Sequence, residues 1–112
     1  MPDPRLKSKI SVMAAIRTSQ GRGLFATVAR KGDEDAGAIL VKQNLMGRGF
    51  RVLTQVRSIE GKLGWGIGTG EEPVEETVAD AYIARQVDRD GDIWVVEIED
   101  KDGRNPFEVP AF

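Results

Sequence analysis

The stretch PVEETVADAYIARQVDRDGDIWVVEIE, residues 73–99, contains the two best-marked elements of the chain and decides its fold class. Pro73 suits the first position of a helix, and the glutamates on either side of it suit the positive end of the helix dipole. This helix is expected to stop near Asp88–Gly91. The stripe expected to face the rest of the protein consists of Val78, Ala81, Tyr82 and Arg85.

Residues 93–99 predict a strand after this helix, because β-branched and aromatic residues dominate the run. The residues expected in the core are Ile93 and Val95, with Trp94 and Val96 as further candidates. The turn Asp100–Gly103 ends the strand. The tail, residues 104–112, is expected to fold back onto the sheet, because two exposed phenylalanines would promote aggregation. A docking peptide is the alternative for this tail.

Upstream, residues 24–30 and 37–43 are rich in strand-forming residues and flank a polar turn at 31–36, which predicts a hairpin. Residues 50–57 alternate between apolar and polar side chains and predict the next strand. Residues 63–70 alternate between glycine and larger residues. That alternation indicates a thin edge strand against which another backbone or Trp94 packs, or a loop laid close to other backbone.

Residues 6–18 predict a first helix that ends before Gly21 and Gly23. Its apolar arc consists of Leu6, Ile10, Val12, Met13 and Ile16. Apolar and small residues also alternate within residues 10–17, so a strand is the rival interpretation.

The element order α-β-β-β-(β)-α-β predicts an α+β protein. We expect a small antiparallel or mixed sheet of four to five strands, with two helices packed on one face. Residues 1–112 are expected to form a single domain that ends in a short tail, residues 104–112.

The sequence contains no cysteine and no histidine. This composition excludes a disulfide scaffold, a Ser-His-Asp triad and zinc sites of the ordinary type. No cofactor and no metal site are expected. The sequence shows neither a signal peptide nor a membrane-spanning stretch, so a cytoplasmic protein is expected.

Charge is unevenly distributed along the chain. Residues 1–62 carry 12 basic and 5 acidic side chains, whereas residues 63–112 carry 4 and 13. Three consecutive acids in the turn, Asp33, Glu34 and Asp35, are the candidate binding site. They could dock a basic partner or hold Mg²⁺ or Ca²⁺, but the plainer interpretation is that Asp33 and Asp35 shape the turn through hydrogen bonds to the backbone.

Three further patterns are weaker. Asp88, Asp90, Asp92 and Glu99 imitate the spacing of a calcium loop, but the run between Asp92 and Glu99 favours a strand. The glycine run lacks the lysine and hydroxyl residue of a phosphate-binding loop. Basic residues in the N-terminal half suggest nucleic acid, although nearby stacking aromatics are almost absent. These basic residues are Arg5, Lys7, Lys9, Arg17, Arg22, Arg30 and Lys31.

Several segments resemble one known family. One segment is KGDEDAGA at residues 31–38, followed by Val41 and Lys42, and another is 79–82 with the later run 92–104. They are similar to the signatures of the bacterial family called domain of unknown function 1491. Residues 4–8 are similar as well, whereas residues 44–72 show no clear correspondence. The resemblance implies a small bacterial cytoplasmic protein and supplies no catalytic residues.

The leading hypothesis is a non-enzymatic protein-binding or accessory module that acts through a sheet face, an edge strand or the acidic turn. A small carboxylate-based or divalent-metal-dependent enzyme, using Asp33, Asp35 or the group at 88–92, is the alternative. Nucleic-acid binding through the basic N-terminal half is the second alternative. A protein partner or a homodimer is expected, and a nucleic-acid or membrane partner is not.

Overall fold

The last strand of the chain lies inside the sheet rather than at its edge. In the computed structural model, which describes residues 7–61 and 63–108, β5 (Trp94–Glu99) pairs antiparallel with β1 (Phe25–Arg30) and parallel with β2 (Ile39–Asn44). Trp94, Val95, Val96 and Ile98 are all buried. A strand with a neighbour on each side and a helix over each face has few positions left for solvent, which explains its nearly continuous apolar run.

The predicted hairpin between residues 24–30 and 37–43 is wrong, because β5 inserts between β1 and β2. The sheet has the order β1-β5-β2-β3-β4, in which β3 (Phe50–Arg57) pairs antiparallel with β2 and with β4 (Leu63–Ile67). The turn at 31–36 therefore bridges two strands that do not touch. The three consecutive buried residues Ile39–Val41 are typical of an inner strand, not of one arm of an isolated hairpin.

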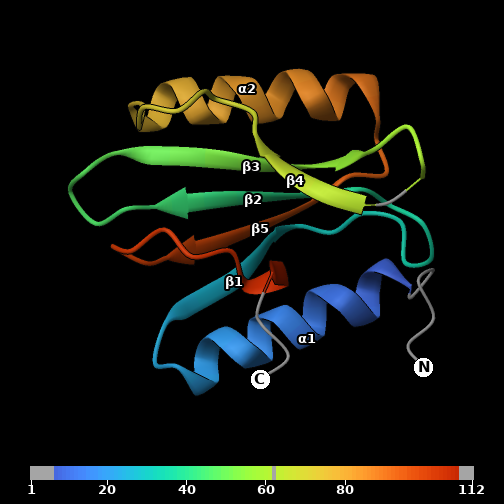
Figure 1. Ribbon diagram of the computed structural model, residues 1–112, viewed down its shortest axis with the longest axis horizontal. Coiled ribbons are helices and arrows are strands. Elements are labelled where there is room, and N and C mark those ends of the chain that lie inside the picture. The colour runs from blue at the N-terminus through green and yellow to red at the C-terminus, as the bar shows by residue number, and fades with distance from the viewer. Residues whose placement is uncertain (1–6, 62, 109–112) are drawn as a thin grey trace.

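The two helices lie on opposite faces of the sheet, whereas the sequence predicted both on one face (Figure 1). Helix α1 (Ser8–Gly21) packs Val12 and Ile16 against the face that carries Trp94, Val96 and Ile98. Helix α2 (Glu76–Arg89) covers the other face, and its buried or half-buried residues are Ala79, Tyr82 and Ile83. Strands that are apolar on both faces need a cover on each. The structure is thus α+β, with a five-stranded mixed sheet between two helices.

Helix α1 confirms the helical interpretation, although its buried face differs from the predicted arc. Ile10 and Met13 are exposed, and Leu6 lies outside the described residues. Val12 and Ile16 are buried as predicted, and the rest of the buried face is small: Ser8, Ala15 and Ser19. Small side chains allow the helix to approach the sheet closely. The helix continues through Gly21, further than predicted.

Helix α2 begins three residues after Pro73, because Val74 first pairs with Phe50 of β3 through two backbone hydrogen bonds of 2.8 Å. Of the predicted stripe only Tyr82 is even half-buried, whereas Val78, Ala81 and Arg85 are exposed. The buried stripe is centred on Ala79 and Ile83 instead. A displacement of one residue rotates a helical stripe by about 100°, so a small error in phase selected the wrong face.

The glycine run forms an edge strand, as one of the two interpretations predicted. Gly64 and Gly66 face the same side of the sheet as α2, where the side chain of Val56 lies against them. The Tyr82 ring lies directly on Gly68. Glycine is therefore required for packing at Gly68, where it makes room for Tyr82, whereas a Cβ at Gly64 or Gly66 would be in ordinary contact with Val56. Trp94 lies on the other face.

The segment after β5 folds back onto the sheet as far as the structure describes it. A turn at Asp100–Gly103 leads into the short 3-10 helix η1 (Pro106–Glu108), where Phe107 stacks on Trp65 of β4 with ring centroids 5.2 Å apart. Residues 109–112 of the predicted tail lie outside the described residues. Of the two helices in the described part, neither is long and apolar enough to cross a membrane.

Gly37 is expected to be essential for stability, because a Cβ at this position would overlap the carbonyl oxygen of Asp92. We expect Gly37→Ala to lower the free energy of unfolding by about 1–3 kcal/mol, measured by chemical denaturation. Gly21→Ala is the matched control, because a Cβ there meets nothing within 4 Å. It should raise stability by about 0.5–1 kcal/mol, since Gly21 is helical. Equal effects at both positions would contradict the packing argument.

Candidate functional site

The acidic segment Asp33–Asp35 lies in the connection between β1 and β2, beside the start of α1 (Figure 1). The N–H groups of Ser8 and Lys9 donate to the carbonyl oxygens of Asp35 and Glu34, at 3.4 and 3.0 Å. These two N–H groups belong to the first turn of α1 and have no partner inside the helix. The acidic segment therefore caps α1 through its backbone, a role that residue type alone does not indicate.

The side chains of the acidic segment also find partners within the chain. Asp33 Oδ2 accepts the N–H groups of Asp35 and Ala36 at 3.1 and 2.9 Å, which is the predicted shaping of the turn. Asp35 lies 3.6 Å from the ammonium group of Lys7. These contacts use the carboxylates of both aspartates.

Glu34 is the third acid, and it lies 3.2 Å from Lys31 and 3.8 Å from Lys9. The hydrogen bond from Lys31 and the charge of Lys9 hold the pKa of Glu34 below its usual value. Because Glu34 and Asp35 face three lysines and Asp33 bonds to the backbone, the segment offers no excess negative charge to a partner.

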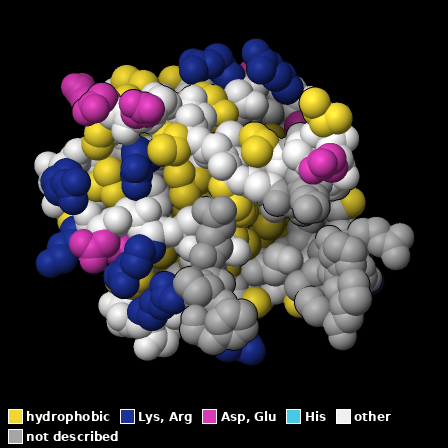
Figure 2. All heavy atoms as spheres, in the orientation of Figure 1, with side chains coloured by type: hydrophobic (Ala, Val, Ile, Leu, Met, Phe, Trp, Pro, Cys, Tyr) yellow, Lys and Arg dark blue, Asp and Glu magenta, His cyan; other side chains and the backbone are white. Residues whose placement is uncertain are grey.

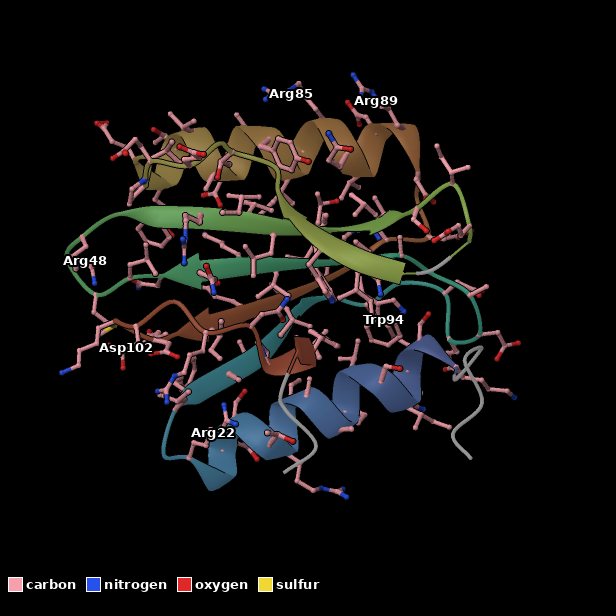
Figure 3. The ribbon with its side chains drawn as sticks, in the orientation of Figure 1. Arg22, Arg48, Arg85, Arg89, Trp94 and Asp102 are labelled. Carbon is pink, nitrogen blue, oxygen red and sulfur yellow. The ribbon has the colours of Figure 1, made fainter. Side chains whose placement is uncertain are left out.

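Trp94 joins the acidic segment to the sheet. The indole N–H of this buried residue donates to the carbonyl oxygen of Asp33 at 2.7 Å. The backbone N–H of Asp33 donates in turn to the carbonyl oxygen of Asp92 at 3.0 Å. Figure 3 shows Trp94 between the sheet and the first half of α1. The candidate residues of the sequence are thus brought together in the structure, but as a joint between α1 and β5.

The calcium-like spacing of Asp88, Asp90, Asp92 and Glu99 does not form a ligand cluster. β5 separates Asp92 from Glu99, and Asp90 accepts the N–H of Asp92 at 3.0 Å in the turn before the strand. Within residues 7–61 and 63–108, no group of three acidic side chains is close enough to hold a metal ion.

Several basic side chains of the N-terminal half are engaged within the fold. Lys7, Lys9 and Lys31 pair with the acidic segment. Arg30 donates to the carbonyl oxygens of Gly91 and Ile93 at 3.0 and 2.8 Å. Arg5 lies outside the described residues. Four of the seven side chains that suggested nucleic-acid binding therefore have partners in the chain itself.

Lys42 is a buried charge that the sequence analysis did not single out. Its side chain on β2 is only 9% exposed, and Nζ lies 2.8 Å from Glu76 Oε2 and 2.7 Å from Asp80 Oδ1 of α2. Burial alone would lower the pKa of Lys42, but the hydrogen bonds with Asp80 and Glu76 outweigh burial and raise it. The available signal was a lone lysine inside the apolar run ILVKQ, residues 39–43.

Next to Lys42, part of the sheet has no helix over it. Glu97 is the neighbour of Lys42 on β5 and is paired on its other side with Thr27, while Glu99 is paired with Phe25. These four residues, Phe25, Thr27, Glu97 and Glu99, point to the α2 side of the sheet but lie beyond the helix, and we call them the open face. Phe25 is 59% exposed. The two glutamates share one face, because side chains two residues apart on a strand point to the same side.

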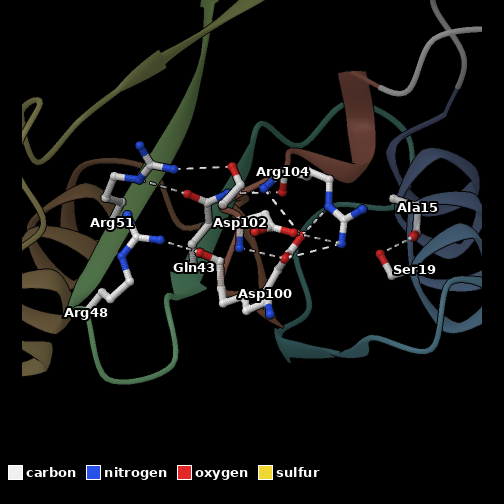
Figure 4. Close-up of polar contacts among 10 residues, drawn as sticks. Ala15, Ser19, Gln43, Arg48, Arg51, Asp100, Asp102 and Arg104 are labelled. Carbon is white, nitrogen blue, oxygen red and sulfur yellow. Dashed lines mark hydrogen bonds and ion pairs between the residues drawn. The ribbon is translucent and has the colours of Figure 1, made fainter.

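The C-terminal loop is held by a second polar network (Figure 4). Asp100, with a side chain only 1% exposed, accepts Arg104 Nε at 2.8 Å and the Asp102 N–H at 2.9 Å. Burial would raise the pKa of Asp100, but these hydrogen bonds outweigh it and lower the pKa. The residues at 100–104 that carried the family resemblance therefore have a structural role.

Three side chains from the middle of the chain attach this loop to the sheet. Gln43 donates to the Arg104 carbonyl at 3.0 Å. Arg51 donates to Gln43 Oε1 at 3.1 Å and to the Gly103 carbonyl at 3.2 Å. Arg48 donates to the Lys101 carbonyl at 2.8 Å. Figure 3 shows Arg48 and Asp102 together at this end of the sheet, whereas Arg85 and Arg89 point outward from α2.

The described contacts define the class of the protein, which is a five-stranded mixed sheet between two helices. A C-terminal loop is hydrogen-bonded to side chains of this sheet and of the turn after β2. The chain belongs to the DUF1491 family, described as a protein family of unknown function, whose model matches residues 6–108. The match includes residues 44–72, where the sequence analysis found no clear correspondence.

Solved structures of this family share the fold. A crystal structure of a DUF1491 family protein from Caulobacter crescentus CB15 is 43% identical, with a TM-score of 0.79, and the match covers 91% of this chain and 94% of that one. An NMR structure of a DUF1491 family protein from the same organism is 42% identical, with a TM-score of 0.80 and coverage of 95% and 96%. Protein Atu0922 from A. tumefaciens is 33% identical, with a TM-score of 0.69 and coverage of 85% and 86%. No functionally curated protein matches the chain.

Removing the charge of Asp100 is expected to weaken the C-terminal loop. Asp100→Asn should lower the free energy of unfolding at pH 7 by about 1–3 kcal/mol, because Arg104 loses its buried partner. The folded state lowers the pKa of Asp100, so the ionised carboxylate contributes to the free energy of unfolding above the ordinary value of 3.8. This contribution is lost as the pH falls through the lowered pKa. Denaturation at several pH values should show the two proteins converging below pH 3.8.

Asp102→Asn is the control for this experiment, because the Asp102 carboxylate is exposed and lies 3.9 Å from Arg104. It should change stability by about 0.5 kcal/mol or less. A pH-independent difference between the wild type and Asp100→Asn would contradict the role of the charge.

The partners of Lys42 are expected to matter more than Lys42 itself. Glu76→Gln combined with Asp80→Asn should destabilise the protein by about 1–2 kcal/mol, a value discounted because both carboxylates are half-exposed. Lys42→Met should be neutral or stabilising, since it replaces the charge by apolar packing. Because the pKa of Lys42 is raised, the contribution of the pair should persist at neutral pH and disappear only above 10.5. Thermal and chemical denaturation measure both effects.

Proposed function

We propose that this chain is a non-enzymatic binding module that docks a basic segment of a partner protein on the open face. The observation that carries the proposal is the position of Glu97 and Glu99, side by side with Phe25 on a part of the sheet that α2 leaves uncovered. The exposed aromatic ring offers apolar contact, and the two acids beside it offer charge complementarity to a basic segment.

Charge supports a basic partner over an acidic one. Glu97 and Glu99 continue toward Glu76 and Asp80, and Lys42 is the basic group among these four acids. Lys42 is held between Glu76 and Asp80, so it cannot also neutralise the two glutamates of the open face fully. A lysine- or arginine-rich segment would supply the missing positive charge, and electrostatic complementarity of this kind favours the correct partner and speeds encounter.

The acidic segment 33–35 is the weaker candidate for docking, although the sequence drew attention to it. Its carboxylates already contact Lys7, Lys9 and Lys31, and its carbonyl groups cap α1. A partner would have to displace these contacts before it could bind. Binding to the open face requires no displacement of such contacts.

The expected setting of this module is the cytoplasm of a bacterium, as the sequence analysis predicted. The similar structures from Caulobacter crescentus and A. tumefaciens support a bacterial origin.

The test is a nuclease-treated pull-down of the tagged protein from its own cell extract, with mass spectrometry of the bound proteins. We expect a stoichiometric partner that binds the wild type and is lost with Glu97→Lys combined with Glu99→Lys. Binding to the wild type should also weaken as the salt concentration rises, because the contact is electrostatic.

Asp88→Lys combined with Glu60→Lys is the matched control, because it makes the same change in net charge at exposed positions outside the open face. It should retain the partner. A partner lost equally from both double variants would show a general effect of charge, and a partner retained by both would exclude the open face as the docking surface.

A further inference from the structure

Strand β4 ends the sheet with a backbone edge that no other strand of the described chain covers. The N–H of Gly68 donates to the Val52 carbonyl at 2.8 Å, which fixes the alternation of the antiparallel pair. Gly64 and Gly66 therefore turn their backbone groups toward β3, and Leu63, Trp65 and Ile67 turn theirs toward the open edge. An edge of this kind is a template for another strand.

The two edges of the sheet differ in how they are protected. At β1 the register shifts between Val28 and Arg30, and such a bulge discourages pairing with another strand. β4 has neither a bulge nor a charged residue nor a proline between Leu63 and Ile67. The usual devices against edge-to-edge association are thus present at β1 and missing from β4.

Apolar side chains gather around the β4 edge. Val56 is 46% exposed beside Gly64 and Gly66, and Ile67 and Ile59 are exposed as well. Figure 2 shows the face that carries β4, with hydrophobic side chains in its middle and basic side chains mostly toward the rim. The edge therefore offers apolar contacts in addition to backbone hydrogen bonds.

We propose that β4 pairs antiparallel with β4 of a second copy of this chain, around a two-fold axis at Trp65, to form a continuous ten-stranded sheet. The register follows from symmetry, because the outward residues 63, 65 and 67 then face 67, 65 and 63 of the second copy. Each Trp65 exchanges two backbone hydrogen bonds with its symmetry mate.

The glycines fit this arrangement. In the same register, Gly64 of one copy lies opposite Gly66 of the other on the α2 side, and no side chain from either strand stands between the exposed Val56 residues of the two copies. The edge of β4 is therefore self-complementary, because its unpaired backbone groups, its apolar neighbours and its side-chain-free strip each meet the same feature of the second copy.

The register gives a specific mutational test, because a Cβ at Gly64 or Gly66 meets only the Val56 side chain, at 3.9 and 3.7 Å. Gly64→Glu combined with Gly66→Glu should leave the monomer folded and place like charges directly opposite each other at both positions of the pair. Sedimentation velocity over a range of concentrations should show dimerisation weakened by about tenfold or more.

Gly64→Lys combined with Gly66→Glu is the matched control, because the same register then places opposite charges across the axis. It should restore dimerisation to within about threefold of the wild type. Thermal denaturation of the monomer at low concentration should be similar for both double variants.

Amide hydrogen exchange supplies a second measurement on the wild type. The Trp65 N–H should become protected as the concentration rises, whereas the Gly66 N–H, bonded to β3, should be protected throughout. A protein that stays monomeric, a dimer that is equally stable in both double variants, or Trp65 protection that does not change with concentration would each overturn the proposal.

Discussion

The pairing of β5 with both β1 and β2 is the constraint on which the rest of the structure depends. Because β2 and β5 run parallel, the chain needs a long connection between them, and β3, β4 and α2 form that connection. Apolar side chains at the start of β5 point to both faces, Trp94 and Val96 to one and Val95 to the other, so each face needs its own helix there. Trp94 at the start of β5 then fixes the acidic segment, which in turn caps α1.

The composition and local patterns of the sequence predicted the elements better than their arrangement. Both helices, all five strands and the α+β class follow from periodicity, glycine and proline positions. The position of β5 does not, because the run IWVVEI at residues 93–98 is compatible with an inner or an outer strand. The neighbours of a strand are set by long-range contacts, whereas propensity describes only its own residues.

The same limit applies to the candidate site. The three acids at 33–35 are conspicuous in the sequence, but the lysines that meet Glu34 and Asp35 come partly from α1, more than 20 residues away along the chain. Lys42 meets Glu76 and Asp80 only after α2 has crossed the sheet. Residue types therefore identified groups able to bind, and the fold decided which of them were already occupied. The open face became visible only once the register of β1 and β5 was known.

The insertion of the last strand between the first two has a consequence for folding of the chain. β1 and β2 lie near each other in sequence but cannot complete the sheet together, because the space between them belongs to residues 94–99. During synthesis, β1 has no strand partner and β2 is paired only with β3 until β5 has left the ribosome. A topology dominated by such non-local pairing folds more slowly than one built from hairpins, and its unpaired strands are the regions that a chaperone would recognise.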